Sequence, residues 1–314
     1  MTGPTTGPTT LTARNPEDLL AVVRVVLGFE PADSIVMLTL GARHSCHARV
    51  DLPDDPGDLA QVADLLLRPA AGHGAAAVVF VLFTDDDRRA RRCARALRRR
   101  FERGGVSVLE ALRVDDDRWH PLFGPPRVGA GVPYDVSAHP FVAAAVLDGR
   151  VLHGSREALA ATLVSRPDDV AAVEGALPQP EASGPWVTRL VSRHATASTS
   201  PTDEEAARLL VAVADPHVRD AAWARIPRSE ARRHVELWSG LVRRCPDDLL
   251  PHAAGVLGFA AWLAGDGALA WCAVDRGRQV DPDHSLVGLV ADLLEGAVPP
   301  AEWERRATGL GSAS

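Results

Sequence analysis

Lysine is absent from this sequence, and all 34 basic residues are arginine. The absence excludes a Schiff-base lysine, the lysine of a phosphate-binding P-loop and a lysine general base. Aspartate and glutamate together number 41, which gives a net charge of −7 at neutral pH. This acidic balance argues against a surface that follows a nucleic-acid backbone along its whole length, although one local basic patch is compatible with it. We therefore do not expect nucleic acid as a partner.

Cysteine is scarce, and the four cysteines form no Cys-x-x-Cys pair. They are Cys46, Cys93, Cys245 and Cys272. This spacing predicts reduced, mostly buried thiols. A zinc site can be drawn from Cys46 with His44 and His47, but a fourth ligand is not evident, so we assign no metal ligand.

Long apolar runs and targeting signals are also missing. The longest charge-free apolar segment, residues 253–265, is shorter than the roughly 18 residues that cross a bilayer. Residues 1–8 have neither the basic region nor the apolar core of a secretory signal. We expect a cytoplasmic protein with no membrane partner.

The composition that remains is that of a folded protein. Hydrophobic residues make up 46% and charged residues 24% of 314 residues, which predicts about two domains. Only the ends, residues 1–10 and 307–314, have the composition of disordered tails.

Residues 11–166 show the alternation of helix and strand that is typical of an α/β domain. The expected helices are 15–28, 58–68, 87–103, 141–147 and 155–164, and the expected strands are 34–40, 46–52, 75–83 and 106–114. The first two strands are separated by a spacing that suits an antiparallel hairpin. The last two flank a helix, which predicts a βαβ unit with parallel strands in a mixed sheet. Residues 115–135 are rich in proline and glycine and are predicted to be a long loop.

The second half of the chain is predicted to be all-helical. Six of seven phenylalanines lie at or before Phe141, whereas six of seven tryptophans lie at or after Trp186. We place a linker with partial helix at 167–200 and a helical domain at 201–306. Helix-period stretches lie near 203–214, 217–225, 229–244, 251–264, 267–279 and 285–295.

One helical hairpin, residues 251–284, has the spacing of a tetratricopeptide-like unit. The matching positions are Gly258, Ala261, Ala270, Val274, Gly277 and Pro282. Small residues there let two helices approach closely, which favours a packing role. Use of this hairpin as a peptide-binding groove is the alternative.

Several short motifs together resemble the actinobacterial family known as domain of unknown function 4192. They are Leu27-Gly28-Phe29-x-Pro31-x-Asp33-Ser34, Arg49-Val50-Asp51-x-Pro53, Arg118-Trp119, Gly149-Arg150, Ser155-Arg156-Glu157-x-Leu159 and Ala261-Trp262-Leu263-x-Gly265-Asp266-Gly267-Ala268. The resemblance covers most of residues 11–303 and implies a cytosolic protein with no known activity. That family commonly carries a cluster of cysteines after the Arg-Trp pair, whereas residues 122–127 contain none.

Both strands of the predicted βαβ unit end in the same pattern, three aspartates and an arginine. Parallel strands bring such ends to one edge of the sheet, where open α/β sheets bind ligands. Clustered carboxylates would favour Mg²⁺, which could organise a phosphate, but acids also cap helices and remain solvated. The candidate ligand-binding residues at this edge are Asp85, Asp87, Asp115, Asp117, Arg118, Trp119 and His120.

The predicted helix 87–103 carries nine arginines around an apolar stripe. The alternatives are a solvated outer face and a patch for an anionic partner. For the patch we single out Arg91, Arg95 and Arg99.

Nucleophilic catalysis has little support, because the sequence has neither a Gly-x-Ser-x-Gly elbow nor a His-Glu-x-x-His motif. We assign no catalytic residue and no cofactor. The preferred interpretation is a non-catalytic binding or scaffold module whose partner is a protein bound through the helical domain. The rival is an enzyme that binds a phosphate-containing small molecule or nucleotide at the acidic sheet edge, with Mg²⁺ as an optional requirement.

Overall fold

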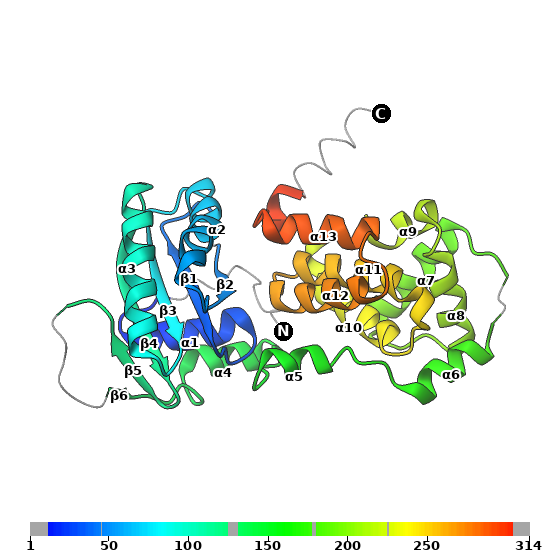
Figure 1. Cartoon of the computed structure of the whole chain (residues 1–314). Coiled ribbons are helices and arrows are strands. Elements are labelled where there is room, and N and C mark those ends of the chain that lie inside the picture. The colour runs from blue at the N-terminus through cyan, green and yellow to red at the C-terminus, as the bar shows by residue number, and fades with distance from the viewer. Residues whose placement is uncertain (1–11, 45, 125–130, 178–179, 225, 304–314) are drawn as a thin grey trace. The chain divides into compact units, whose positions relative to one another are not determined.

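The computed structural model describes residues 12–303 except 45, 125–130, 178–179 and 225. Its contacts divide the chain into two compact units, Met1–Ser155 and Arg156–Ser314. The first unit contains a mixed β-sheet with helices, and the described part of the second unit contains helices without a strand (Figure 1). The predicted fold class is confirmed. The predicted tails, 1–10 and 307–314, lie outside the described residues.

Among the described residues, the sheet of the first unit has six strands in the order β2-β1-β3-β4-β5-β6. The strands are β1 Ser34–Leu40, β2 Ala48–Asp51, β3 Ala77–Phe83, β4 Ser107–Asp115, β5 Arg118–Pro121 and β6 Val132–Pro133. The β1–β2 hairpin is antiparallel as predicted, and β1 also pairs antiparallel with β3. Strands β3 and β4 are parallel and are joined by a helix, which confirms the βαβ unit.

Helices cover both faces of this sheet. They are α1 Pro16–Leu27, α2 Leu59–Gly72, α3 Asp87–Arg103 and α4 Pro140–Leu147, with a short 3₁₀ turn, η1, at Pro56–Asp58. Inward residues of α2 and α3 share one core with Ile35, Phe80 and Leu82 of the central strands. On the other face, Leu20 and Val23 of α1 lie beside Phe83. Because both faces are covered, β3 is buried along its whole length, which explains its unbroken apolar sequence.

Helix α2 continues past its predicted end at residue 68. Pro69 lies inside the helix, and the chain stays helical to Gly72. Proline removes one hydrogen bond to the carbonyl four residues earlier, here that of Leu65. The Leu65 side chain is half exposed, so water can reach this side of the helix. Asp58 precedes the helix as predicted, but its side chain forms no capping hydrogen bond.

The second unit is built around one apolar helix, α11. Its helices are α5 Arg156–Ala161, α6 Pro167–Gly175, α7 Gly184–Ala197, α8 Asp203–Ala212, α9 Pro216–Trp223, α10 Ala231–Val242, α11 Leu250–Leu263, α12 Gly267–Val280 and α13 Ser285–Glu295, with 3₁₀ turns η2 Arg228–Glu230 and η3 Asp247–Leu249. Every residue of α11 except His252 is buried. A helix that is apolar on all sides is expected at the centre of a helical core. The division between the units falls before 167–200, the stretch predicted as a linker, in which the structure places α6 and α7.

Small residues lie where α11, α12 and α13 approach one another. A Cβ atom on Gly258 would lie 3.2 Å from Val290, and one on Gly277 would lie 2.7 Å from Val287. The packing role predicted for the small residues of the hairpin is therefore present in the structure.

Two histidines meet near the start of α13. His284 caps this helix, and its Nε2 lies 2.9 Å from Nδ1 of His252 on α11. Burial, together with the neighbouring His252 and Arg219, lowers the pKa of His284 to about 4, against the opposing effect of Asp281. His284 is therefore neutral in the folded protein at neutral pH.

We expect this histidine to make the second unit less stable in mild acid. The unfolded chain, with a histidine pKa of about 6.5, binds more protons than the folded chain below that pH, so the stabilisation is complete above about pH 6.5 and declines as the pH falls towards about 4. Asparagine also caps helices but does not titrate, so His284→Asn should flatten the dependence of the melting temperature on pH over this range. Tryptophan fluorescence measures this unit, since six of the seven tryptophans belong to it. The control is His217→Asn on the exposed surface of α9, and an equal flattening in both variants would exclude His284 as the cause.

Candidate functional site

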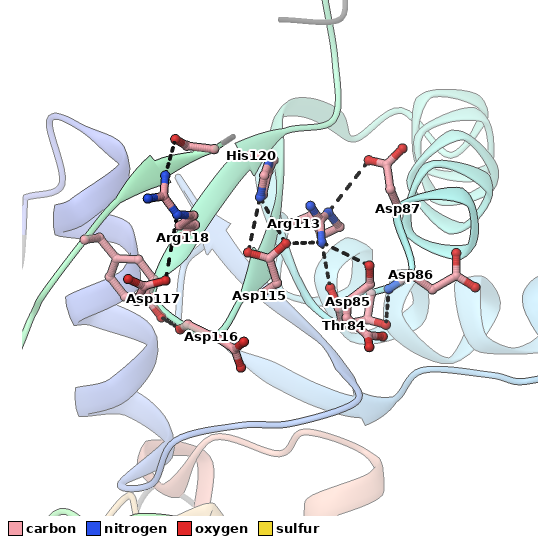
Figure 2. A network of polar contacts seen from close by, with 12 residues as sticks. Thr84, Asp85, Asp86, Asp87, Arg113, Asp115, Asp116, Asp117, Arg118 and His120 are labelled. Carbon is pink, nitrogen blue, oxygen red and sulfur yellow. Dashed lines mark hydrogen bonds and ion pairs between the residues drawn. The ribbon is translucent and has the colours of Figure 1, made fainter. Parts of the chain in front are cut away.

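The carboxyl ends of β3 and β4 meet at one edge of the sheet, as the sequence predicted. Phe83 is in register with Val114, and the backbone N–H of Thr84 donates to the Val114 carbonyl at 3.0 Å. The acidic segments 84–87 and 115–117 therefore lie side by side (Figure 2).

A buried arginine, Arg113, lies between the two acidic segments (Figure 2). Its Nη1 donates to the carbonyl oxygens of Thr84 at 3.2 Å and Asp85 at 3.3 Å, and it forms an ion pair with Asp115. Its Nε lies 3.7 Å from Oδ1 of Asp87. The guanidinium group thus occupies the position between the carboxylates in which the sequence analysis placed a cation.

Arg113 is not among the candidate residues predicted from the sequence. The signal was present, because an arginine inside a mostly apolar strand must find partners when the strand is buried on both faces. In the structure Arg113 is in register with Leu82, whose side chain belongs to the core under α2 and α3. The start of α3 and the end of β4 supply the carboxylates that make this position tolerable for a charge.

The segment after β4 corrects the prediction of a long loop at 115–135. The chain turns at Asp116, whose φ is +39°, and returns as β5 antiparallel to β4, with Asp115 opposite Arg118. Strand β6 then pairs with β5. These short strands are held by backbone hydrogen bonds at the sheet edge and carry no apolar run, so the composition gave no strand signal.

His120 is placed by this extra strand. It lies opposite Arg113, and its Nε2 is 3.0 Å from Oδ2 of Asp115. A Cβ atom on Gly131 would lie only 2.5 Å from the His120 ring, so the backbone just before β6 covers the imidazole. The side chain is 19% exposed. His120 is thus packed against Asp115 and the backbone instead of facing an open site.

The three aspartates after β3 have three different roles. Asp86 caps α3 by accepting a hydrogen bond from the backbone N–H of Arg89 at 2.9 Å, and this bond holds the pKa of Asp86 below its usual value. Asp87 pairs with Arg91 at 2.8 Å. Asp85 is exposed and contributes its backbone carbonyl to the network. The helix-capping alternative therefore describes one of the three.

The remaining candidates do not converge. Asp117 is exposed, with Oδ1 3.9 Å from Nε of Arg118, and Arg118 also donates from Nη1 to the Gly131 carbonyl at 3.1 Å. Trp119 is in register with Val114, whereas Arg118 and His120 point to the opposite face, since neighbours along a strand alternate. Of the seven predicted residues, the structure brings Asp87, Asp115 and His120 together through Arg113, and places the others around them.

The arrangement is that of a salt-bridge network. Within residues 12–303, apart from the gaps given above, no three His, Cys, Asp or Glu side chains come together so as to hold a metal ion. One guanidinium group lies between two carboxylates and donates to two carbonyls, and it thereby joins β3, β4 and α3. Chemically, the network can hold the sheet edge in one conformation.

The zinc site considered at Cys46 and His47 is likewise occupied by internal contacts. The backbone N–H of Thr39 donates to Nδ1 of His47 at 3.3 Å, and the Thr39 hydroxyl accepts from the Cys46 backbone N–H at 3.0 Å. Burial lowers the pKa of His47 to about 4 and raises that of Cys46 to about 11. All four cysteines are free and buried, as predicted.

The arginines of α3 fall into two sets. Five have internal partners: Arg89 with Asp54 and the carbonyls of Leu52 and Pro53, Arg91 with Asp87, Arg98 with Glu102, Arg100 with Asp64, and Arg103 with the Arg99 carbonyl. The other four are exposed, and their guanidinium groups make no hydrogen bond or close ion pair with any residue that the structure describes: Arg88, Arg92, Arg95 and Arg99. We call these four residues the arginine ridge. Of the three arginines predicted as an anionic-partner patch, Arg95 and Arg99 belong to it and Arg91 does not.

Fold and site together define a protein with an α/β unit, whose sheet edge is closed by internal ion pairs, followed by a helical unit. The chain belongs to the family described as Domain of unknown function (DUF4192), whose model matches residues 16–301. No curated protein and no solved structure matches the sequence. In the part of the chain that the structure describes, the helices lack the length and apolar character that crossing a membrane requires.

Proposed function

We propose that this protein is a non-catalytic binding module that holds an acidic segment of a partner protein on the arginine ridge. The observation that carries the proposal is the ridge itself, four exposed guanidinium groups on one face of α3 that form no hydrogen bond or close ion pair with any described residue. The other five arginines of the same helix each have an internal partner.

The ridge has the geometry of a linear docking surface. Its residues are spaced by 4, 3 and 4 positions, which places them on one face of a helix, and at 1.5 Å per residue they extend over about 16 Å. Like charges about 6 Å apart repel by roughly 0.7 kcal/mol in water. The ridge therefore contributes nothing to folding, and a ligand of opposite charge would relieve the repulsion.

The shape of the ridge favours a short acidic segment over a nucleic acid or a membrane. Beside the ridge, Arg91 and Arg98 are paired with Asp87 and Glu102, so the positive charge without a close carboxylate follows the ridge and Arg103, whose partner is a backbone carbonyl. The exposed Asp85 and Asp86 stand at its amino-terminal end. A duplex or a bilayer would extend past these carboxylates and meet a chain of net charge −7, whereas a helix with carboxylates at matching spacing would not.

Two other sites from the sequence have less support: the sheet edge of the rival enzyme, and the helical domain through which the preferred interpretation binds a protein. An enzyme at the sheet edge would need carboxylates free to act on a ligand, and Asp87 and Asp115 are engaged by Arg113. A protein groove in the helical unit would need a contiguous apolar surface. The large apolar side chains exposed in the described part of that unit are Val164, Val211 and Val280. They belong to three different segments of the chain: the residues after α5, helix α8 and the end of α12.

Binding to an acidic helical peptide tests the proposal. The probe is a labelled peptide of about 15 residues with glutamates at i, i+4, i+7 and i+11, measured by fluorescence anisotropy with the full chain. We expect Arg92→Gln with Arg95→Gln to weaken binding at least tenfold, because two charge-assisted contacts are lost. The melting temperature should stay constant or rise slightly, since repulsion is removed.

The matched control removes the same charge from the same helix. Arg91→Gln with Arg98→Gln takes two arginines that are already paired with Asp87 and Glu102, so it should weaken binding less than threefold. Equal losses in both variants would show a diffuse charge effect and reject the ridge. If a DNA duplex of about 15 base pairs or anionic vesicles bind more tightly than the peptide, the partner is a nucleic acid or a membrane and the proposed acidic protein is rejected.

A further inference from the structure

A polar cavity of about 280 Å³ lies within the second unit. It is formed by the start of α6, the end of α7, the loop before α8, and α10 with the residues that follow it. Its volume corresponds to roughly nine waters at about 30 Å³ each, which is enough for a small polar ligand. This cavity is separate from both the sheet edge and the arginine ridge, which belong to the first unit.

Four arginines line the cavity: Arg166, Arg233, Arg243 and Arg244. Arg244 is mostly buried and is held by the Pro201 carbonyl at 3.0 Å and by Asp203 at 3.5 Å, while its Nε is buried without a hydrogen-bond partner. The guanidinium groups of Arg233 and Arg243 form no hydrogen bond or close ion pair with the residues described. Positive charge in the cavity therefore exceeds what its own ion pairs use.

Another part of the lining is a hydroxyl-bearing loop, residues 198–200, which is held by internal hydrogen bonds. Nδ1 of His194 lies 2.8 Å from the Thr199 hydroxyl, and Nε2 lies 3.1 Å from Oε2 of Glu205. Glu205 is itself fixed in a capping box with Thr202 at the start of α8. Ser198 adopts a left-handed conformation, φ +51°, which turns the chain into this loop. The loop is thus organised before any ligand arrives.

We infer that this cavity binds a phosphorylated sugar or polyol. Arginine recognises phosphate through paired N–H donors, and Arg233 and Arg243, which line the cavity, are available for it. The carboxylates of Asp169 and Glu236 also line the cavity and can accept hydrogen bonds from ligand hydroxyls. Among the described residues that line it, His194 has the only aromatic ring, so they offer a nucleobase no larger stacking surface.

Calorimetry on the full chain in a phosphate-free buffer tests the inference. The probes are glucose 6-phosphate, ribose 5-phosphate and glycerol 3-phosphate, with inorganic phosphate and glucose as references. At least one of the three phosphorylated probes should bind at least tenfold more tightly than inorganic phosphate, and glucose should give no heat. Arg243→Gln should weaken that binding at least tenfold. Because this variant could disturb the end of α10, a second variant at an exposed position, Arg233→Gln, is measured as well and should also weaken binding at least tenfold.

The matched control is Arg189→Gln, an exposed arginine of α7 that does not line the cavity and should leave the affinity unchanged. The inference is overturned if none of the phosphorylated probes binds, if inorganic phosphate binds as tightly as they do, or if Arg189→Gln costs as much as Arg243→Gln. The result is independent of the arginine ridge, because Arg92→Gln with Arg95→Gln alters a different unit and should leave the heats unchanged.

Discussion

Replacing Arg113 with methionine is expected to destabilise the first unit by about 3 kcal/mol. Methionine fits the space of the arginine stem but leaves Asp115 and Asp87 facing each other without the cation. The carbonyls of Thr84 and Asp85 also lose a donor. Removing one partner of a buried ion pair typically costs about 3–5 kcal/mol, and the partial exposure of Asp115 places the expected loss at the lower end.

Hydrogen–deuterium exchange of β3 and β4 measures this loss locally, which matters because a chain of two units need not unfold in one step. About 3 kcal/mol corresponds to exchange that is faster by roughly a hundredfold. The control is Arg91→Gln, which breaks a partly exposed pair with the same Asp87 and should cost about 0.5 kcal/mol or less.

A double-variant cycle separates the network from simple loss of an arginine. With Asp115→Asn, one carboxylate no longer needs compensation, so Arg113→Met should cost less in that background by at least about 1 kcal/mol. Additive losses would mean that the two side chains do not act as a pair, and would contradict the structural role assigned to this edge.

Gly277→Leu in α12 is expected to lower the stability of the second unit by about 3 kcal/mol. A Cβ atom at this position would lie 2.7 Å and 3.3 Å from the two methyl groups of Val287, and 3.5 Å from Ala254. Valine has little rotamer freedom to move aside, so the helices must separate. The better helix propensity of leucine offsets less than about 1 kcal/mol of this cost.

Gly288→Ala in α13 is the matched control with the opposite sign. A Cβ atom there meets nothing within 4 Å, so the variant should gain about 0.5–1 kcal/mol from helix propensity alone. Tryptophan fluorescence should show a melting temperature lower by about 10 °C for Gly277→Leu and higher by about 2–3 °C for Gly288→Ala. A neutral Gly277→Leu would show that the close approach of α12 and α13 is not required.

The parts of the fold that the sequence predicted have strong local signals. Strand β3 is an unbroken apolar run, α1 has a cap residue at each end, and the apolar stripe of α3 recurs at helical spacing. Strands β5 and β6 were missed because they are short, carry no apolar run and are held by backbone bonds at one side of the sheet. Such strands depend on β4 already being in place, and no local pattern encodes that.

The candidate site shows the same division between local and tertiary information. Parallel strands predicted that Asp87 and Asp115 would share an edge, but only the tertiary structure shows that Arg113 lies between them. On α3, which arginines are compensated depends on distant carboxylates such as Asp64 of α2 and Asp54 of the preceding loop. The cavity of the second unit combines residues of four helices, so no single motif could indicate it.

The central claim is that the protein works by binding at the arginine ridge, and that the acidic sheet edge is structural. One anisotropy titration with the acidic peptide compares the ridge variant, Arg92→Gln with Arg95→Gln, with an edge variant, Asp85→Asn, which removes an exposed carboxylate but keeps the carbonyl that Arg113 uses. The account predicts at least a tenfold loss for the ridge variant and unchanged or slightly tighter binding for the edge variant. Unchanged binding by the ridge variant, or a larger loss at Asp85, would contradict it.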